Sequence, residues 1–324
     1  MEWLRQHVLR DCRKFTDMIP IAMALTFGLL LLGSLVWLLA THFIPALPSY
    51  AEDDPPSYEK ILGMYMNFAC IWPTVALAIA IPPANRRIFR DIMPNGRGNS
   101  LKGIALGLLL GFGLNTACIV ISSLLGHVSL GLTDVDPLRM LALFGAVFLQ
   151  SGAEEITSRQ FLFEKLRRRY QSPWVAIIFN SLFFMAMHLF NPGISAFAVT
   201  QIFLIGFIFS LFVHYFDGLW VAIFFHTAWN YTQNIIFGCP NSGQPGMYSL
   251  FTLTDSHAGP FFDPIFGVEG SVGACAVLAV LAAGILVFVR VKGIQGKDLW
   301  ADLDAPRLEE APKPQLASKP KHFA

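Results

Sequence analysis

The chain has 324 residues, of which 54% are hydrophobic and only 14% charged, and its mean hydropathy is +0.54. Soluble domains carry about 25% charged residues, so this composition is that of a membrane protein. The net charge of +1 excludes the strongly basic surface typical of nucleic-acid binding. The five cysteines have no CxxC spacing, which indicates neither a disulfide framework nor a structural zinc site.

Apolar runs along the chain predict membrane-spanning helices, each of which needs about 20 residues to cross a hydrocarbon core. The expected spans lie at about 19–43, 61–83, 101–125, 138–162, 174–190, 196–215, 219–237 and 271–290. The fifth run is short, and only "FDG" separates the sixth from the seventh. We therefore expect an all-α polytopic membrane protein with about eight transmembrane helices, and seven is the alternative count.

The charges of the connecting segments test this count. Lys and Arg gather before the first span, after the second and after the fourth, whereas "AEDDPPSYEK" and "GHVSLGLTDVDP" are acidic and residues 238–270 contain no Lys or Arg. Basic loops face the cytoplasm. The pattern predicts that both termini are cytoplasmic, which requires an even number of spans and favours eight. Residues 238–270 are then an external loop that caps the bundle.

Ionisable side chains in the middle of the expected spans are concentrated in the fourth, fifth and seventh. The fourth holds Glu154, Glu155 and Arg159, the fifth ends with His188, and the seventh holds His226 and Asn230. Ionisable residues inside a membrane are rare and usually functional. This concentration predicts one polar site built from three helices.

Helical spacing separates the two glutamates of the fourth span. Glu155 and Arg159 are four residues apart and can pair on one face. Glu154 falls instead on a polar stripe that contains Gln150 and Ser151. The spacing leaves Glu154 as the carboxylate that is free to act as a general base.

A carboxylate and a histidine can deprotonate water, while a second histidine and an amide can stabilise an oxyanion. The residues thus favour hydrolysis of a carbonyl compound, foremost a peptide bond. Other interpretations stay open. The Glu155–Arg159 pair can be purely structural, each histidine can simply join helices by hydrogen bonds, and Glu154, His188 and His226 can hold zinc.

Three motifs carry a family resemblance. "EEITSR" fits EExxxR, "FMAMH" fits FxxxH and "HTAWN" fits HxxxN, in order and in three different spans. Over about residues 100–290 the chain resembles the CPBP family, the CAAX-protease, bacteriocin-processing or Abi family of intramembrane glutamate-type proteases. Gln160 departs from the pattern, since the family commonly has glycine after the motif arginine. This departure suggests a divergent substrate channel.

The resemblance implies a role for each matching position. Glu154 and His188 would activate the attacking water, His226 and Asn230 would form the oxyanion hole, and Glu155 and Arg159 would support them. It implies no required cofactor, although zinc held by Glu154, His188 and His226 remains a variant.

The expected organisation is a cytoplasmic N-terminal segment (1–18), N-terminal transmembrane helices (19–137), a CPBP-like catalytic transmembrane core (138–291) and a disordered cytoplasmic tail (292–324). The expected activity is intramembrane proteolysis near the membrane–cytoplasm boundary. The substrate would be a membrane-embedded or membrane-tethered protein or peptide that is prenylated or bears a leader or sorting tag.

The expected location is the lipid bilayer, as a multi-pass protein of the cell (inner) membrane if the source is bacterial, with no nucleic-acid partner. Two alternatives belong to other classes: a non-catalytic scaffold or bacteriocin-immunity protein of the same fold, and a proton-coupled transporter.

Overall fold

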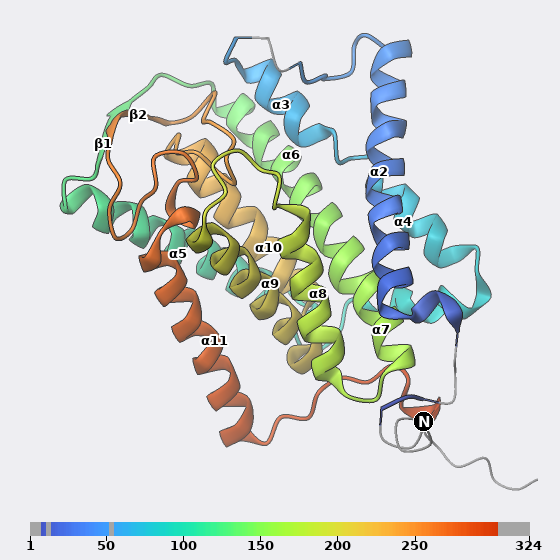
Figure 1. Cartoon of the computed structure of the whole chain (residues 1–324). Helices are drawn as coiled ribbons and strands as arrows, with labels where there is room; N and C mark the ends of the chain where they lie inside the picture. The colour runs from blue at the N-terminus through green and yellow to red at the C-terminus, as the bar shows by residue number, and fades with distance from the viewer. Residues whose placement is uncertain (1–7, 11–13, 52–54, 304–324) are drawn as a thin grey trace, which may run out of the picture.

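The computed structural model describes residues 8–10, 14–51 and 55–303, which form a bundle of helices with one small two-stranded sheet (Figure 1). The helices of the bundle are α2 (Ile19–Phe43), α3 (Tyr58–Met66), α4 (Ile71–Ala80), α5 (Leu101–Leu124), α6 (Pro137–Glu155), α7 (Phe163–Arg169), α8 (Pro173–Met187), α9 (Ala196–Phe216), α10 (Leu219–Asn230) and α11 (Val272–Lys292). The short helical segments are η1 (Phe15–Asp17), η2 (Pro83–Asp91), η3 (Ile156–Leu162), η4 (Tyr231–Ile236), η5 (Val268–Gly270) and η6 (Ala301–Leu303).

Within the described residues, five helical segments are long and apolar enough to cross a membrane: Ile19–Phe43, Tyr58–Ala80, Leu101–Leu124, Ala196–Phe216 and Val272–Lys292. The expected all-α polytopic membrane fold is confirmed. The other three expected spans are helical but shorter or interrupted: α6 with η3, α8, and α10 with η4. The count of eight and the placement of the termini stay predictions.

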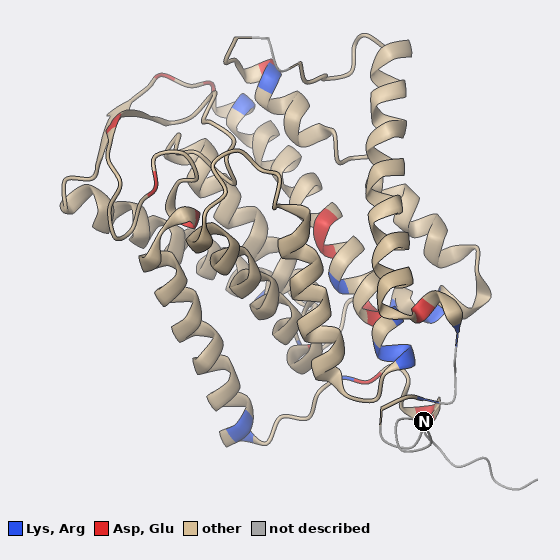
Figure 2. Ribbon diagram, in the orientation of Figure 1, with Lys and Arg blue, Asp and Glu red and all other residues tan. Residues whose placement is uncertain are grey.

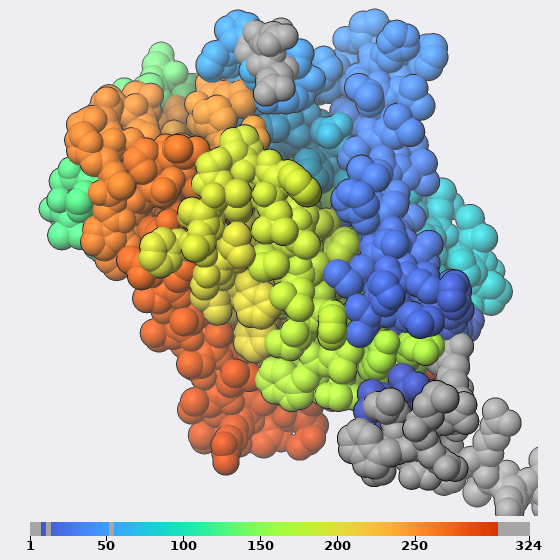
Figure 3. Space-filling model, viewed as in Figure 1, coloured from blue at the N-terminus to red at the C-terminus, as the bar shows by residue number. Residues whose placement is uncertain are grey.

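Helix α2 shows the surface expected of a lipid-facing span. Its buried residues are Ala22, Thr26, Gly33 and Trp37, which lie along one side of the helix. Leucines elsewhere on the same helix are exposed, among them Leu31 and Leu38 at 55% and 62%. An apolar surface of this kind is stable only in contact with lipid or another protein. In the space-filling view α2 and α11 lie on opposite flanks of the face, with α8 between them (Figure 3).

A row of glycines brings α5 against α10, the helix that carries two motif residues. Gly103, Gly107 and Gly111 are buried at intervals of four residues. A Cβ at Gly107 would lie 2.5 Å from the Val221 carbonyl oxygen, and one at Gly111 would lie 2.4 Å from the Phe225 carbonyl oxygen. Small residues at such intervals allow helix backbones to approach closely in membranes. These glycines therefore set the position of α10.

Two of the three motif-bearing helices, α6 and α10, are followed directly by π-helical turns, η3 and η4. A π turn shifts the direction of later side chains and is frequent at functional sites. The helical run through α6, η3 and α7 continues from Pro137 to Arg169, so the expected fourth span extends without a break into the basic segment.

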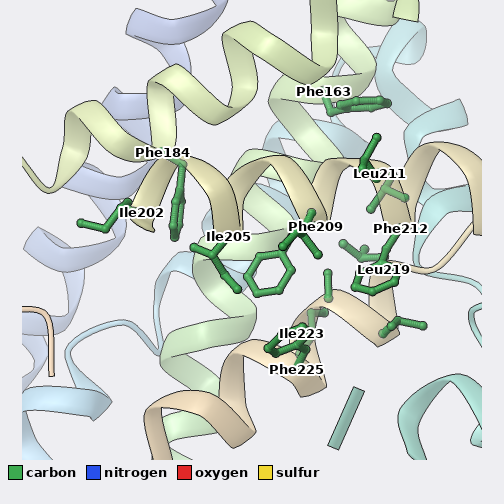
Figure 4. Packing of buried hydrophobic residues seen from close by; sticks show 14 of the residues in the cluster. Phe163, Phe184, Ile202, Ile205, Phe209, Leu211, Phe212, Leu219, Ile223 and Phe225 are labelled. Carbon is green, nitrogen blue, oxygen red and sulfur yellow. The ribbon is translucent and has the colours of Figure 1, made fainter. Parts of the chain in front are cut away.

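Aromatic and branched side chains of α8, α9 and α10 form the centre of the core (Figure 4). Phe209 of α9 packs edge-on against Phe225 of α10, with ring centroids 5.4 Å apart. The ring of Phe184 in α8 belongs to the same cluster and contacts the Arg159 guanidinium at 4.1 Å. Two phenylalanines of the expected sixth span, Phe209 and Phe212, thus pack within the protein, whereas Phe197 of the same helix is 50% exposed.

The segment expected to be an external loop contains a strand. Strand β2 (Phe251–Ser256) pairs antiparallel with β1 (Val128–Leu132), with a register irregularity between Ser129 and Leu130. The two-stranded sheet, whose strands are far apart in the sequence, lies at the end of the bundle away from α7 (Figure 1). Pairing within the loops satisfies backbone groups that helices cannot satisfy there.

The expectation of a disordered tail from residue 292 is corrected for residues 293–303. Trp300 is 4% exposed and donates from Nε1 to Glu164 Oε2 at 2.8 Å, and Lys297 pairs with Asp91 and Asp217. A buried tryptophan and paired charges stabilise an ordered segment despite its polar composition. The rest of the expected tail, 304–324, and residues 1–7 and 11–13 of the N-terminal segment lie outside the described residues.

Candidate active site

A cavity of about 750 Å³ lies between the helices that carry the three motifs. Glu154 of α6, His188 at the end of α8, and His226 and Asn230 of α10 all line it. The remaining walls come from α2 and α3 on one side, including Phe27 and Tyr65, and from residues 241–245 and Met247 on the other. The structure thus brings the four expected catalytic residues to one cavity, whereas Glu155 and Arg159 lie behind its wall.

Glu154 faces the cavity with one oxygen bound and the other free. Its Oε1 accepts a hydrogen bond of 2.7 Å from the Gln150 amide, one helical turn earlier. Within the described residues its Oε2 has no hydrogen-bond partner and lies 3.9 Å from His226 Nε2, too far for a hydrogen bond. A fully engaged carboxylate could not accept a proton readily, so the free oxygen suits Glu154 to act as a base.

Glu155 and Arg159 form the ion pair that the spacing indicated. Arg159 Nη1 lies 3.1 Å from Glu155 Oε1, and both side chains are 0% exposed. The same oxygen lies 3.0 Å from His226 Nδ1, a contact that spacing along one helix could not reveal. Because Glu155 pairs with Arg159, it accepts from His226 Nδ1–H and fixes the ring with Nε2 toward the cavity.

His188 is fixed in a similar manner. Its Nδ1 lies 2.8 Å from the carbonyl oxygen of Phe184, one turn earlier on α8. A carbonyl oxygen only accepts hydrogen bonds, so this contact assigns the proton to Nδ1 and leaves the Nε2 lone pair of neutral His188 free. His188 can therefore accept a proton from a molecule in the cavity.

Asn230 is oriented by two amides. Its Nδ2 donates to Gln150 Oε1 at 3.2 Å, and its Oδ1 accepts from Asn241 Nδ2 at 3.3 Å. An amide nitrogen carries two hydrogens, so one N–H of Asn230 remains for a ligand. Gln150 thereby joins Asn230 to Glu154, which the polar stripe alone did not reveal.

Glu269 of η5 is a buried acidic residue that the motifs missed. Its Oε1 accepts from Trp229 Nε1 at 3.0 Å and from Asn241 Nδ2 at 3.1 Å. Its Oε2 accepts from the backbone N–H and the hydroxyl of Ser242 at 2.7 and 2.8 Å. Burial raises the pKa of Glu269, while the two bonds from Ser242 and the bond from Trp229 oppose this rise.

These contacts make Glu269 the anchor of the 241–245 wall of the cavity. The sequence offered one signal, an isolated acidic residue between Gly267 and Gly270 immediately before an apolar helix. Gly267 has a φ of +69°, which glycine adopts without strain and which lets the chain turn there.

The cavity lies toward the end of the molecule away from the basic segments. One of its walls comes from residues 241–245 and Met247, in a segment (238–270) that contains no Lys or Arg, and Lys60 of α3 is the one Lys or Arg among the described residues of the lining. The Arg cluster of α7 lies at the opposite end (Figure 2). The expected cleavage near the membrane–cytoplasm boundary stays a prediction, because it depends on the placement of the termini, which is itself a prediction. Sequence spacing along single helices could not give this depth, because it depends on where α8 starts relative to α6.

Gln160 does not line the cavity. Its Nε2 donates to the Ile88 carbonyl oxygen at 3.2 Å and ties η3 to η2. This departure from the family pattern therefore acts in packing and not in the cavity.

Within the described part of the chain, no group of three His, Cys, Asp or Glu side chains is arranged to hold a metal ion. His188 and His226 each engage Nδ1 elsewhere and present Nε2, the orientation that a zinc-bound histidine usually has. Because no three of the described side chains lie close enough to share a metal ion, the zinc variant would need Glu154 and the two rings to move closer together.

Comparisons with known proteins bear on this core. Residues 136–232 match the family model described as type II CAAX prenyl endopeptidase Rce1-like, and this range contains all three motifs. The uncharacterized protein YyaK of Bacillus subtilis (strain 168) is 22% identical over 253 residues, which cover 74% of this chain and 84% of YyaK. No solved structure matches the chain.

The family match supports an intramembrane endopeptidase in general terms, and the apolar helices make the chain an integral, multi-pass membrane protein. Residues 136–232 carry the signature of the Rce1-like type II CAAX prenyl endopeptidases, which confirms the family resemblance that the three motifs indicated.

Proposed function

We propose that this protein hydrolyses a peptide bond in a membrane-embedded or membrane-tethered protein or peptide, with Glu154, His188, His226 and Asn230 as its catalytic residues. The observation that carries the proposal is that these four residues, from α6, α8 and α10, line one cavity. Glu155 and Arg159 support the site from behind through His226.

Water is activated between Glu154 and His188. The free Oε2 of Glu154 takes one proton, and the water oxygen adds to the scissile carbonyl carbon while the carbonyl electron pair moves to oxygen. The unprotonated Nε2 of His188 holds the water through a hydrogen bond. The proton on Glu154 then passes to the amide nitrogen as the C–N bond breaks, so that a carboxyl and an amine product result.

The oxyanion is stabilised from α10. The second N–H of Asn230 is oriented by Gln150 and Asn241, so it is placed before the reaction begins. His226 already donates from Nδ1 to Glu155. It can therefore donate from Nε2 to the oxyanion only when the ring carries both protons.

The walls of the cavity favour a substrate that approaches from the bilayer. Phe27 of α2 lines the cavity and is 47% exposed on a lipid-facing helix, while Asn241 and Gln244 line the opposite, polar wall. A substrate peptide with one apolar part and one extended, polar part would fit a cavity that has an apolar wall and a polar wall. Prenylated C-termini and leader or sorting-tag peptides are the two substrate classes to compare.

Glu154→Gln preserves the volume of the side chain and removes the base. In proteoliposomes supplied with prenylated and unprenylated membrane-tethered peptides, we expect it to lower cleavage by about 10²–10⁴-fold, the usual contribution of general-base catalysis. Glu59→Gln serves as the matched control because Glu59 lies outside the cavity with a side chain 71% exposed.

Unchanged turnover in the folded Glu154→Gln protein would contradict the mechanism. If membrane proteomes from cells with the wild-type protein and with Glu154→Gln show no difference in cleaved proteins, a non-catalytic scaffold is favoured. If the wild-type protein carries a proton flux that Glu154→Gln loses, a transporter is favoured. Loss of cleavage in chelator with recovery on zinc addition would identify the metal-dependent variant.

A further inference from the structure

A second cavity, of about 530 Å³, lies at the opposite end of the bundle from the sheet. It is formed by η1 and Lys14 before it, the first turns of α2, the end of α4, η2, η3 and α7. Its apolar walls include Leu25, Leu29, Ala78 and Phe161. Leu25 is 42% exposed and Phe15, also in the lining, is 70% exposed. The cavity therefore opens on the lipid-facing side of α2.

Positive charge exceeds negative charge in this cavity. Lys165 Nζ lies 2.9 Å from Asp17 Oδ1, and Arg168 Nε lies 2.6 Å from Asp17 Oδ2. Burial opposes ionisation of Asp17, but the bonds and charges of Arg168 and Lys165 outweigh it and hold the pKa of Asp17 below its usual range. The single carboxylate of Asp17 thus forms ion pairs with both Lys165 and Arg168.

Lys14 is the third cation in the lining, and it has no ion pair or side-chain hydrogen bond within the described residues. The cavity therefore holds three positive side chains against one negative one. Lys14 offers all three ammonium hydrogens, and Lys165 uses one of its three on Asp17. The excess charge lies next to the apolar walls of this cavity. It is at the end of the molecule where the Lys and Arg residues near α7 gather (Figure 2).

We propose that this cavity binds an anionic phospholipid, with the phosphate at Lys14 and Lys165 and an acyl chain along Leu25, Leu29 and Phe161. Basic pockets between transmembrane helices bind acidic lipid headgroups. A free phosphate would make no contact with the apolar walls, whereas the acyl chain of a lipid would. The bound lipid would hold η1 and α2 against α7. This site is separate from the catalytic cavity and does not depend on the proposed protease activity.

The test uses the purified full chain in detergent and measures thermal unfolding and lipid retention by native mass spectrometry. Phosphatidylglycerol, phosphatidylcholine with the same acyl chains, and glycerol phosphate are titrated separately. We expect phosphatidylglycerol to raise the unfolding temperature and to be retained, phosphatidylcholine to have a much smaller effect, and glycerol phosphate to have none.

Lys14→Gln should weaken phosphatidylglycerol binding about fivefold, the effect of one lysine near an anionic surface. Lys14→Arg should restore it. Lys292→Gln is the matched control, because it removes the same charge from an exposed lysine at the end of α11, outside the cavity. Ala78→Phe fills part of the apolar wall and should weaken phosphatidylglycerol binding without altering the Lys14 region.

Equal binding of phosphatidylglycerol and phosphatidylcholine would overturn the proposal, as would equal affinity in Lys14→Gln and Lys292→Gln. Glycerol phosphate that binds as tightly as the lipid would identify a soluble-phosphate site instead. If Lys14→Gln fails to fold, the Ala78→Phe titration alone decides, and unchanged phosphatidylglycerol affinity there refutes the acyl channel.

Discussion

Arg159 is a buried cation whose principal neighbours are one carboxylate and the faces of two aromatic rings. Its guanidinium lies 4.1 Å from the Phe184 ring centroid and 5.4 Å from that of Phe209, on the side away from the cavity. Within the described residues its Nε and Nη2 have no hydrogen-bond partner. Its stability therefore rests on Glu155 and on the aromatic faces.

Removing Arg159 alone should leave the Glu155 charge buried without its cation. We expect Arg159→Met to lower the free energy of unfolding by about 3–5 kcal/mol, and Glu155→Gln with Arg159→Met to recover part of the loss. A double-mutant cycle measured by SDS or thermal unfolding in detergent checks this. Additive losses from the two single variants would show that the two side chains act independently.

Both carboxylate oxygens of Glu269 act as acceptors, and each accepts two hydrogen bonds. Glu269→Gln would set an amide N–H₂ against two of these donors and loosen Asn241, which orients Asn230. We expect kcat to fall by about tenfold or more with KM little changed, because the oxyanion donor and not the binding surface is affected. Steady-state kinetics in proteoliposomes measure the two constants.

Glu59→Gln again provides the exposed control for Glu269→Gln. A rise in KM with kcat unchanged would indicate that the 241–245 wall binds substrate and does not position Asn230. Unchanged kinetics would remove Glu269 from any role in the site.

At the scale of the elements, the position of α10 depends on the glycines of α5. Gly111→Leu would place a side chain where even a Cβ lies 2.4 Å from the Phe225 carbonyl oxygen and 2.6 Å from the Ala228 Cβ. We expect overpacking to cost about 1–3 kcal/mol or more and to displace His226 and Asn230, so activity should fall with stability. Gly113→Leu is the control, since a Cβ there meets nothing within 4 Å.

Retained activity and an unchanged unfolding temperature in Gly111→Leu would show that α5 and α10 can separate without affecting the site. The measurement is cleavage together with thermal unfolding of both variants in the same detergent.

The sequence predicted the features that follow from spacing within a single helix. It did not predict the contacts between residues of two different segments. The i,i+4 spacing predicted the Glu155–Arg159 pair, and the apolar runs predicted the helical segments, because both depend on local geometry. The contact of His226 with Glu155 joins residues 71 positions apart, and Glu269 contacts Trp229 across 40. Such contacts follow from the packing of helices, which periodicity does not determine.

At the scale of the whole molecule, the clusters of Lys and Arg and the catalytic cavity lie at different ends. The basic clusters surround α7, whereas the catalytic cavity is walled by residues of the 238–270 segment. The positive-inside pattern then predicts that the basic end is cytoplasmic and that the cavity opens toward the other side of the membrane. The side from which substrate enters therefore follows from the orientation of the chain.

This orientation can be measured with single cysteines introduced into a protein whose native cysteines are replaced by serine or alanine. Asp255→Cys on β2 and Arg97→Cys before α5 both place the thiol at an exposed position. With a membrane-impermeant maleimide on intact cells, we expect Asp255→Cys to react at once and Arg97→Cys to react only after permeabilisation. The reverse pattern would place the basic loops outside and the cavity on the cytoplasmic side, because the two sites lie at opposite ends of the same bundle.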